Sequence, residues 1–392
     1  MKKTFAEVVL LARTGLNPRK NFKLGQGNNN YITIKNIKNN TLVIDENTDV
    51  VDDEAIKLIH KRSKIKKGDI LFASIGRMGD MYIIEDDPVG WDINESVFVF
   101  TLDTNIVRQK YFYYIFRVKS TLDYLASNSS GSTFKSIKMN QLKKMTFDIP
   151  PLEKQDQIVA TLDKVCNVIE MRKQELISLD DLIKARFVEL FGDAVDNPMG
   201  WKKKSLQEIV TDDCTISYGI VQTGDNQEEG VPVFRPVDIV NRVPRLDELK
   251  KTTEEISNKY KRTILKGREM LITVRANIAD TCIVGEEFKG CNVGRGIVPI
   301  RIQEDIMTLE FLKYLIDSKH LNDEIKNKAK GITLLQLNME DLREIKLIIP
   351  PLNQQNVFVK FVKQVDKSKV AVQKALDETQ LLFNSLMQEY FG

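Results

Sequence analysis

One stretch of the sequence contains the residue types of a metal-dependent nuclease. Pro236-Val-Asp238 is followed by Glu248-Leu-Lys250, and two carboxylates with a lysine are the groups that hold Mg²⁺ beside an attacking water. Such triplets arise by chance in a chain that is 29% charged, and the first half of the sequence has no counterpart. We therefore interpret the stretch as coincidental. Cleavage of plasmid DNA with Mg²⁺ would contradict this interpretation.

Other catalytic signatures are missing from the sequence. Methyl transfer to adenine needs an Asn/Asp-Pro-Pro-Tyr/Phe motif for the flipped base and a Gly-rich loop for S-adenosylmethionine. The Pro-Pro pairs at 149–152 and 349–352 lack the amide and the aromatic ring, and no Gly-x-x-x-x-Gly-Lys-Ser/Thr phosphate loop occurs. The four cysteines and two histidines share no metal-ligand spacing. The sequence predicts a protein that is not an enzyme and has no cofactor or metal site.

The sequence is an internal repeat. The segment 131–152, which ends in Asp-Ile-Pro-Pro-Leu, recurs as 331–352, which ends in Ile-Ile-Pro-Pro-Leu, and the Phe-Gly pair at 191–192 recurs at 391–392. Between the matching blocks the two copies differ strongly, most of all in 14–35 and 217–235. A shared scaffold with divergent inserts indicates two similar domains that recognise different targets.

A heptad pattern follows each Pro-Pro pair. In the first copy the two lanes are Ile158, Val165, Arg172, Leu179, Arg186 and Leu162, Ile169, Leu176, Ile183, Leu190. In the second copy they are Phe358, Val365, Val372, Thr379, Leu386 and Val362, Lys369, Leu376, Phe383, Tyr390. No Gly or Pro interrupts either pattern, which predicts two helices of about 38 residues and about 55 Å. Because such a seam is unstable alone in water, we expect the helices to pack together as an antiparallel coiled coil.

Four polar residues interrupt these lanes. They are Arg172, Arg186, Lys369 and Thr379. One interpretation is that their aliphatic stems line the edge of the seam while the polar ends reach water. The other is that they contact a partner subunit or fix the register of the two helices.

The remaining parts of both copies have a mixed pattern, and the fold class is α/β (α+β). Short β-branched runs bounded by Gly, Asn and Asp predict strands at 30–37, 69–74 and 96–102. Helices are predicted at 109–125 and 309–326. A short polar loop with an arginine follows the central strand of each copy, at 74–80 and 273–280. The predicted organisation is two globular domains, 1–150 and 193–350, each followed by a long helix, 151–192 and 351–392.

The ordered motifs resemble those of the specificity subunits of type I restriction-modification enzymes. They are Ile-Pro-Pro-Leu-x-x-Gln at 149–155 and 349–355, Lys-Gly-Asp-Ile-Leu at 67–71, the Phe-Gly helix ends, and Trp201-Lys-x-x-x-Leu206. Each motif alone is weak, but the ordered set occurs twice and spans nearly all 392 residues. The second copy departs from the pattern at Lys266-Gly-Arg-Glu-Met-Leu271, where one residue is inserted.

The resemblance implies an architecture and a set of partners. Each globular domain would be a target recognition domain that reads one half of a split site on double-stranded DNA. The paired helices would fix the distance between the half-sites and dock two methyltransferase (modification) subunits, and a motor-nuclease (restriction) subunit would join the complex. Helices of about 55 Å suit readers one to two turns of B-DNA apart, where one turn is about 34–36 Å.

Basic and hydroxyl residues without acidic neighbours are candidates for phosphate contacts. The stretch 57–67 contains no acidic residue and includes Lys61 and Arg62, with a solvated helix face as the alternative. The candidates that follow Gly131 and Gly331 are Ser132, Thr133, Lys135 and Thr333. A plain turn is the alternative for this second group.

Base reading requires paired donors and acceptors, arginine for guanine and asparagine or glutamine for adenine. The divergent segments and the arginine loops provide such side chains. In the first copy they are Arg19, Lys20, Lys23, Gln26, Asn28 and Arg77. In the second copy they are Tyr218, Gln222, Arg235, Arg275, Asn277 and Arg295. The alternative for each is an ordinary surface residue.

The composition favours a cytoplasmic protein with no membrane partner. The 58 basic and 55 acidic residues give a net charge of +3, which excludes histone-like binding. No run of about 18 apolar residues occurs, and no clear cleavage pattern follows the apolar residues 5–12. Two alternatives to a DNA-specificity scaffold remain. A fragment of a self-contained restriction enzyme, or a reader for a related modification system, would carry fused catalytic motifs, and a coiled-coil adaptor would lack salt-sensitive DNA binding.

Overall fold

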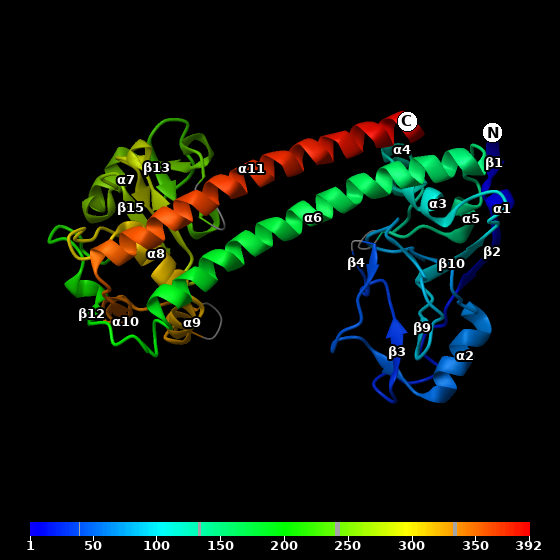
Figure 1. Ribbon diagram of the computed structural model, residues 1–392, viewed down its shortest axis with the longest axis horizontal. Helices are drawn as coiled ribbons and strands as arrows, with labels where there is room; N and C mark the ends of the chain where they lie inside the picture. Colours follow the sequence, from blue (N-terminus) through cyan, green and yellow to red (C-terminus); the bar gives the residue numbers. More distant parts are fainter. Residues whose placement is uncertain (39, 132–134, 240–243, 332–334) are drawn as a thin grey trace. The chain divides into compact units, whose positions relative to one another are not determined.

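The computed structural model describes residues 1–38, 40–131, 135–239, 244–331 and 335–392. The chain forms two compact units (Figure 1): unit 1 is Met1–Lys173 with Lys374–Gly392, and unit 2 is Gln174–Gln373. Two long helices, α6 (Leu152–Phe191) and α11 (Leu352–Phe391), are each divided between the units. Each unit is therefore larger than a predicted globular domain, because it includes part of both helices. Among the described residues, no helix is both long and apolar enough to cross a membrane.

Unit 1 is built on a four-stranded antiparallel sheet with the order β2-β10-β7-β8. Its strands are β2 (Val9–Thr14), β7 (Ile70–Ala73), β8 (Met81–Ile83) and β10 (Val97–Leu102). In a second sheet β3 (Asn29–Ile32) pairs antiparallel with β6 (Val50–Val51) and parallel with β9 (Trp91–Ile93). The smaller pairs are β1 (Lys2–Thr4) with β11 (Thr146–Asp148) and β4 (Ile37–Lys38) with β5 (Thr41–Leu42). The short helices are α1 (Phe5–Val8), α2 (Asp53–Ser63), α3 (Gln109–Ile115), α4 (Lys119–Ser127) and α5 (Met139–Leu142).

Unit 2 repeats this plan. Its antiparallel sheet has the order β16-β15-β18, and its mixed sheet has the order β14-β13-β17. The strands are β12 (Lys203–Ser205), β13 (Val231–Phe234), β14 (Lys250–Thr252), β15 (Glu269–Thr273), β16 (Thr281–Val284), β17 (Asn292–Val293), β18 (Ile297–Ile300) and β19 (Lys346–Ile348). The helices are α7 (Glu254–Lys259), α8 (Leu309–Asp317), α9 (Lys319–Asn327) and α10 (Met339–Arg343). Short 3-10 turns occupy η1 (Leu206–Glu208), η2 (Pro236–Asp238), η3 (Leu246–Glu248), η4 (Lys261–Thr263) and η5 (Glu286–Phe288).

The strand register shows that the repeat is structural. In unit 1 Ile70 lies opposite Phe100, and in unit 2 Met270 lies opposite Ile300, 200 positions later in both strands. The inward-facing residues of the two sheets therefore correspond one for one, since a shift of one residue would turn every side chain to the other face.

Three local predictions were wrong in detail. The helix predicted at 109–125 is two helices, because Val118 adopts an extended backbone (ψ 148°) that ends the helical hydrogen bonding. The helix predicted at 309–326 breaks in the same way at Ser318, whose hydroxyl donates to the Leu315 carbonyl at 2.6 Å. The strand predicted at 30–37 is interrupted at 33–36 by a turn, in which the Asn36 side chain accepts from the Thr33 N–H at 2.9 Å.

The long helices begin directly after the Pro-Pro pairs, and the motif glutamine explains why. Gln155 is fully buried, accepts from the Arg108 N–H at 2.8 Å and donates to the Ile106 and Pro150 carbonyls at 2.8 Å each. Gln355 makes the same three contacts in unit 2, with Thr308, Ile306 and Pro350. The glutamine therefore joins the start of each long helix to the loop before α3 or α8, and its own buried amide is hydrogen-bonded.

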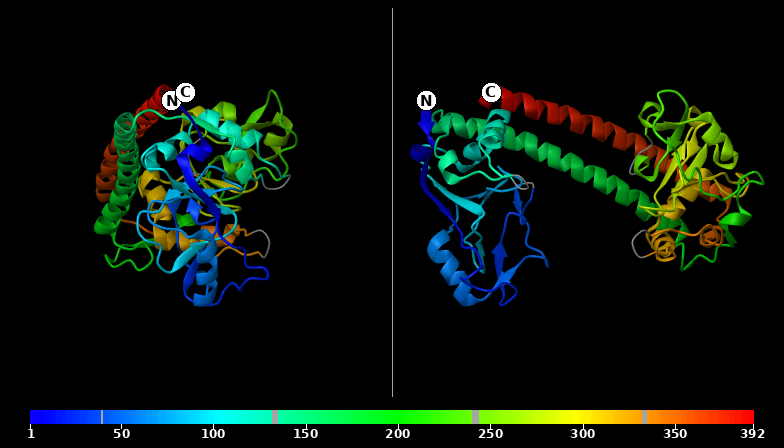
Figure 2. Two further views of the ribbon diagram at one scale, coloured as in Figure 1. Left: turned by 90° about the vertical axis from the view of Figure 1, so that its right-hand side faces the viewer. Right: turned by 180° about the vertical axis from the view of Figure 1, so that it is seen from behind.

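The predicted antiparallel packing of the long helices is confirmed. In each unit a segment of α6 lies beside a segment of α11 (Figures 1 and 2), and every residue of the predicted lanes is buried or half-buried. Hydrophobic residues of both helices join the core of their unit: Leu162 and Met387 in unit 1, Phe187 and Phe358 in unit 2.

All four polar lane residues make contacts between the two long helices. Arg172 donates to the Ala375 carbonyl and the Thr379 hydroxyl in unit 1. Lys369 pairs with Asp180 at 2.6 Å in unit 2. Arg186 pairs with Glu189 on its own helix at 2.7 Å, and its guanidinium lies over the Phe361 ring of the facing helix at 5.8 Å. Arg172 and Lys369 therefore favour one register, because a slip of either helix would separate them from their partners.

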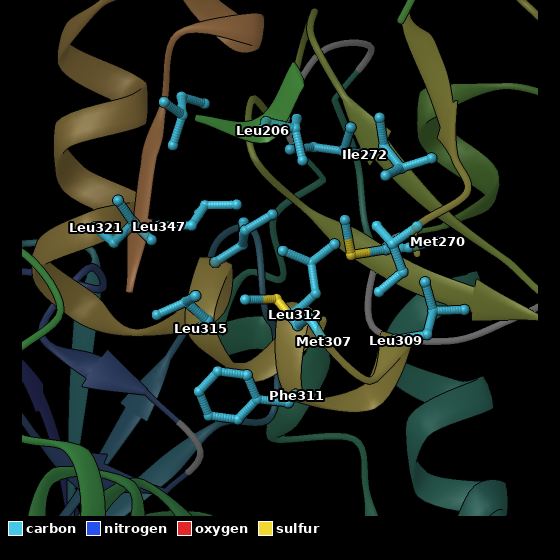
Figure 3. Close-up of a cluster of buried hydrophobic side chains, with 14 of the residues drawn as sticks. Leu206, Met270, Ile272, Met307, Leu309, Phe311, Leu312, Leu315, Leu321 and Leu347 are labelled. Atoms are coloured by element: carbon cyan, nitrogen blue, oxygen red, sulfur yellow. The ribbon is translucent and has the colours of Figure 1, made fainter. Parts of the chain in front are cut away.

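The core of unit 2 is an apolar layer that links its antiparallel sheet to α8 (Figure 3). Met270 and Ile272 from β15 lie among Phe311, Leu312 and Leu315 from α8, all fully buried. The equivalent cluster in unit 1 surrounds Phe72, Phe100, Phe112 and Phe116. These cores fix the strands from whose ends the candidate site loops extend.

The second copy has Lys266-Gly-Arg-Glu where the first copy has the Lys-Gly-Asp motif, but the carboxylate of each motif accepts the same backbone hydrogen bond. Asp69 is buried and accepts from the Lys66 N–H at 3.2 Å, and Glu269 is buried and accepts from the Lys266 N–H at 2.6 Å. The carboxylates differ in their arginine. Asp69 pairs with Arg13 from β2 at 2.8 Å, whereas Glu269 pairs with Arg301, directly after β18, at 3.2 Å. The strand after the motif is thus held equivalently in both units.

Candidate nucleic-acid interface

Three segments of unit 2 meet beyond the end of β15. Arg275 and Gln336 lie opposite each other in an isolated antiparallel bridge, and the Leu337 N–H donates to the Val274 carbonyl at 2.9 Å. The Val274 N–H donates to the Gly296 carbonyl at 2.8 Å. The arginine loop 273–280, the turn at 294–296 and the residues 336–337 are therefore joined by backbone contacts.

Two parts of the divergent segment 217–235 of unit 2 reach the same turn. Ile220 forms a parallel bridge with Gly294, whose N–H donates to the Phe234 carbonyl at 2.8 Å. Gly219 permits this approach, because a Cβ there would lie 1.8 Å from the Val293 carbonyl oxygen. The predicted residues on these joined segments are Tyr218, Gln222, Arg235, Arg275, Asn277 and Arg295. Thr333 lies outside the described residues.

The predicted arginines of unit 2 differ in their partners. Arg235 makes a two-point contact with Asp238, at 3.0 Å from Nε and 2.7 Å from Nη2, and these hydrogen bonds raise the pKa of Arg235. Arg275 donates instead to the neutral side-chain oxygen of Gln336. Arg295 is exposed between the buried Gly294 and Gly296. Arg275 and Arg295 therefore present more uncompensated positive charge than Arg235.

The predicted residues of unit 1 form two groups. Arg77 and Lys135 belong to the counterpart of the unit 2 site: Ile75 is bridged to Ser136, and the Gly76 N–H donates to the Lys135 carbonyl at 3.1 Å. Arg77 also donates to the Ile37 carbonyl of β4 at 3.2 Å and lies 3.5 Å from Asp80. Ser132 and Thr133 lie outside the described residues.

The other group of unit 1 lies elsewhere. Lys61 and Arg62 are exposed in the last turn of α2, which is drawn well apart from β4 within this unit (Figure 1), and Arg62 Nε donates to the Thr14 hydroxyl at 3.3 Å. Arg19, Lys20 and Lys23 are exposed on the loop between β2 and β3. This loop is anchored by Phe22 against Tyr31, with ring centroids 5.4 Å apart, and by the Tyr31 hydroxyl, which donates to the Leu16 carbonyl at 2.6 Å.

Gln336 is the site residue that the sequence prediction missed. It lies in the repeated block 331–352, which was interpreted as shared scaffold, yet the first copy has Ser136 at this position. The two copies of this block are identical at only 8 of 22 positions, so the difference between Ser136 and Gln336 did not mark the position as functional.

The nuclease-like carboxylates are engaged by arginines. Asp238 is held by Arg235, and Glu248 lies 3.7 Å from Arg245.

Among the described residues, one group of side chains has potential metal-ligand atoms within 4.8 Å of one another. It consists of Asp193, Asp196 and His320. Asp193 there accepts from the Val195 and Asp196 N–H groups and contacts His320 Nδ1 at 2.5 Å. Burial opposes ionisation of Asp193, but these contacts outweigh it and lower the pKa of the carboxyl.

A family model described as "Type I restriction modification DNA specificity domain" matches residues 1–180 and 198–379. The chain belongs to this family. It therefore carries two DNA specificity domains, and members of the family are the non-catalytic specificity subunits of type I systems. This agrees with the prediction that the chain is not an enzyme.

Named relatives and solved structures agree with the family. The EcoBI specificity subunit of Escherichia coli is 23% identical over 319 residues, which cover 76% of this chain and 67% of that protein. The putative MjaX specificity subunit of Methanocaldococcus jannaschii is 25% identical over 332 residues, which cover 79% of this chain and 75% of that protein. The type I S subunit structure from M. genitalium covers 100% of this chain and 96% of its own at 15% identity, with a TM-score of 0.54. A chain from a structural study of complex assembly in the type I R-M system has a TM-score of 0.61 at 19% identity. The match covers 99% of this chain and 96% of that chain. At these identities the structures support the specificity-subunit fold.

Proposed function

We propose that this specificity subunit reads a bipartite DNA target, one half-site with the domain at 1–150 and the other with the domain at 193–350. One observation carries the proposal: the same scaffold presents different side chains at equivalent places. Arg77 in unit 1 and Asn277 in unit 2 are 200 positions apart on corresponding loops, and both are exposed. Arginine suits guanine and asparagine suits adenine, so the two loops would select different bases.

A matched pair of variants tests this function. Arg77→Ala and Asn277→Ala are each expected to relax base preference in a different half-site, by roughly 5-fold to 150-fold at one position, because each bidentate contact contributes about 1–3 kcal/mol of discrimination. The measurement is a map of methylated adenines made by the subunit together with its methyltransferase. Relaxation of the same half-site by both variants, or of both half-sites by one, would contradict the assignment.

The docking of two methyltransferase subunits on the helical regions 151–192 and 351–392 is the second part of the proposal. Each unit has a groove between one long helix and the junction of its two short helices. In unit 1 it is lined by Lys119, Phe383, Asn384 and Gln388, and in unit 2 by Lys319, Ile183, Lys184 and Val188. These residues correspond at an offset of 200, and two equivalent grooves fit two copies of one partner. Exposed apolar side chains on the helices, such as Val188 at 58% and Leu381 at 66%, favour a covered surface.

Charge placed in these grooves should remove the partner one copy at a time. Val188→Glu in unit 2 and Gln388→Glu in unit 1 each add a carboxylate at an exposed position, which a contacting apolar surface would have to desolvate. Native mass spectrometry is expected to show one methyltransferase fewer for each variant and none for the double variant. Ser178→Glu, an exposed substitution on α6 outside both groove linings, is the control. Unchanged stoichiometry in the double variant would refute docking at these grooves.

A further inference from the structure

We propose that Gln336 determines specificity by orienting Arg275 to read a guanine in the half-site bound by unit 2. The inference rests on the proposed DNA-reading function and adds a base, a reading side chain and the residue that positions it. The opposing bridge positions of unit 1 are occupied by Ile75 and Ser136. The arrangement is therefore confined to one unit.

The backbone on both sides of this pair is fixed. Gln336 exchanges two backbone hydrogen bonds with Lys330, both at 3.0 Å, and the next residue, Leu337, donates to the Val274 carbonyl at 2.9 Å. Arg275 immediately follows Val274, which is fully buried and donates to the Gly296 carbonyl at 2.8 Å. The Cα atoms of Arg275 and Gln336 thus keep a defined separation without any side-chain contact.

The side-chain contact then sets the direction of the guanidinium. Arg275 Nη2 donates to Gln336 Oε1. The backbone of Gly296 packs closely beside the base of this side chain, since a Cβ built on Gly296 would lie 3.4 Å from the Arg275 Cβ and 2.5 Å from the Pro236 Cγ. An arginine held at its base and at one terminal nitrogen loses less conformational entropy when it binds a planar ligand.

The partner of Arg275 is neutral, and this distinguishes it from Arg235 and Arg77. Asp238 compensates the charge of Arg235, and Asp80 lies beside Arg77. In the described part of the chain no carboxylate pairs with Arg275, its Nη1 has no hydrogen bond, and its Nε is buried without a partner. Gln336 therefore orients the group without compensating its charge. The remaining donors match the O6 and N7 acceptors on the major-groove edge of guanine.

The test uses the full chain in complex with its methyltransferase and maps the adenines methylated by wild type and variants. Gln336→Met keeps the length of the side chain but removes the acceptor, and it is expected to lower the preference for guanine at one position of one half-site by about 10-fold. Gln336→Glu keeps the acceptor that orients Arg275, so it should retain the preference for guanine, although its added charge should weaken binding of that half-site. Arg275→Lys, which cannot form the bidentate contact, should relax the same position as Gln336→Met. Ser136→Ala, at the equivalent position of unit 1, should leave that position unchanged.

The outcomes separate this inference from the proposed function. If wild type methylates a defined bipartite site but Gln336→Met and Arg275→Lys retain every base preference, relax different positions, or relax a position that is not guanine, the inference is overturned. If Gln336→Met does not fold, the comparison of Arg275→Lys with Gln336→Glu decides. If wild type together with its methyltransferase recognises no bipartite site, the proposed function itself is refuted.

Discussion

Phe358→Ala is expected to destabilise unit 2 by about 3–5 kcal/mol, the usual cost of removing a fully buried aromatic side chain. Phe358 belongs to α11 and has no exposed surface. Its ring contacts Phe187 of α6 and Tyr314 of α8, each with centroids 5.5 Å apart, as well as Phe191 at 5.7 Å and Phe311 at 6.4 Å. One ring therefore joins three helices, and the cavity left by alanine would have walls that cannot close together.

Each unit contains one of the two tryptophans, which makes the measurement specific. Trp91 belongs to unit 1, and Trp201 packs against the core of unit 2. In a Trp91→Phe background, urea unfolding followed by fluorescence reports unit 2 alone. The neighbouring Val357→Ala, at a position that is 52% exposed, should change the free energy of unfolding by less than about 0.5 kcal/mol. A loss below about 1 kcal/mol for Phe358→Ala would show that α11 does not depend on this cluster.

Arg301→Met should cost unit 2 about 3–5 kcal/mol, because it leaves a buried carboxylate without its cation. Glu269 has no exposed surface, and its contacts are Arg301 at 3.2 Å and the Lys266 N–H at 2.6 Å. Its Oε2 atom has no hydrogen-bond partner among the described residues. Glu269 therefore depends on Arg301, whose side chain is 11% exposed and also donates to the Asp213 carbonyl at 2.9 Å.

A second substitution distinguishes charge from packing. Adding Glu269→Gln to Arg301→Met removes the unpaired charge, so the double variant should be more stable than Arg301→Met alone, again by Trp201 fluorescence. Arg268→Met is the control, because Arg268 is 54% exposed and pairs only with surface carboxylates, and exposed pairs contribute about 0–1 kcal/mol. If the double variant is no more stable than the single one, the ion pair is not the reason that Arg301 is needed.

The sequence alone determined the features that depend on local pattern. The internal repeat was recognised from matching residues at an offset of 200 positions. The Pro-Pro pairs and the heptad patterns predicted where both long helices begin and which faces they bury, as the lanes of α6 and α11 confirm. Helical periodicity is a property of neighbouring residues, so it can be read without knowledge of the fold. The same reasoning failed at Val118 and Ser318, where the predicted helix is divided by a residue with extended backbone.

Tertiary structure decided which side chains meet. Arg275 and Gln336 are 61 residues apart and meet because a bridge aligns their segments. The buried carboxylates Asp69 and Glu269 take their arginines from different places in the fold, Arg13 from β2 and Arg301 from the position after β18, although the motifs correspond. Contacts of this kind depend on how distant strands pair, and hydrophobic periodicity carries no information about partners so far along the chain. For the same physical reason the predicted DNA-contacting residues of unit 2 gather on joined segments, whereas those of unit 1 divide among the arginine loop, α2 and the loop between β2 and β3.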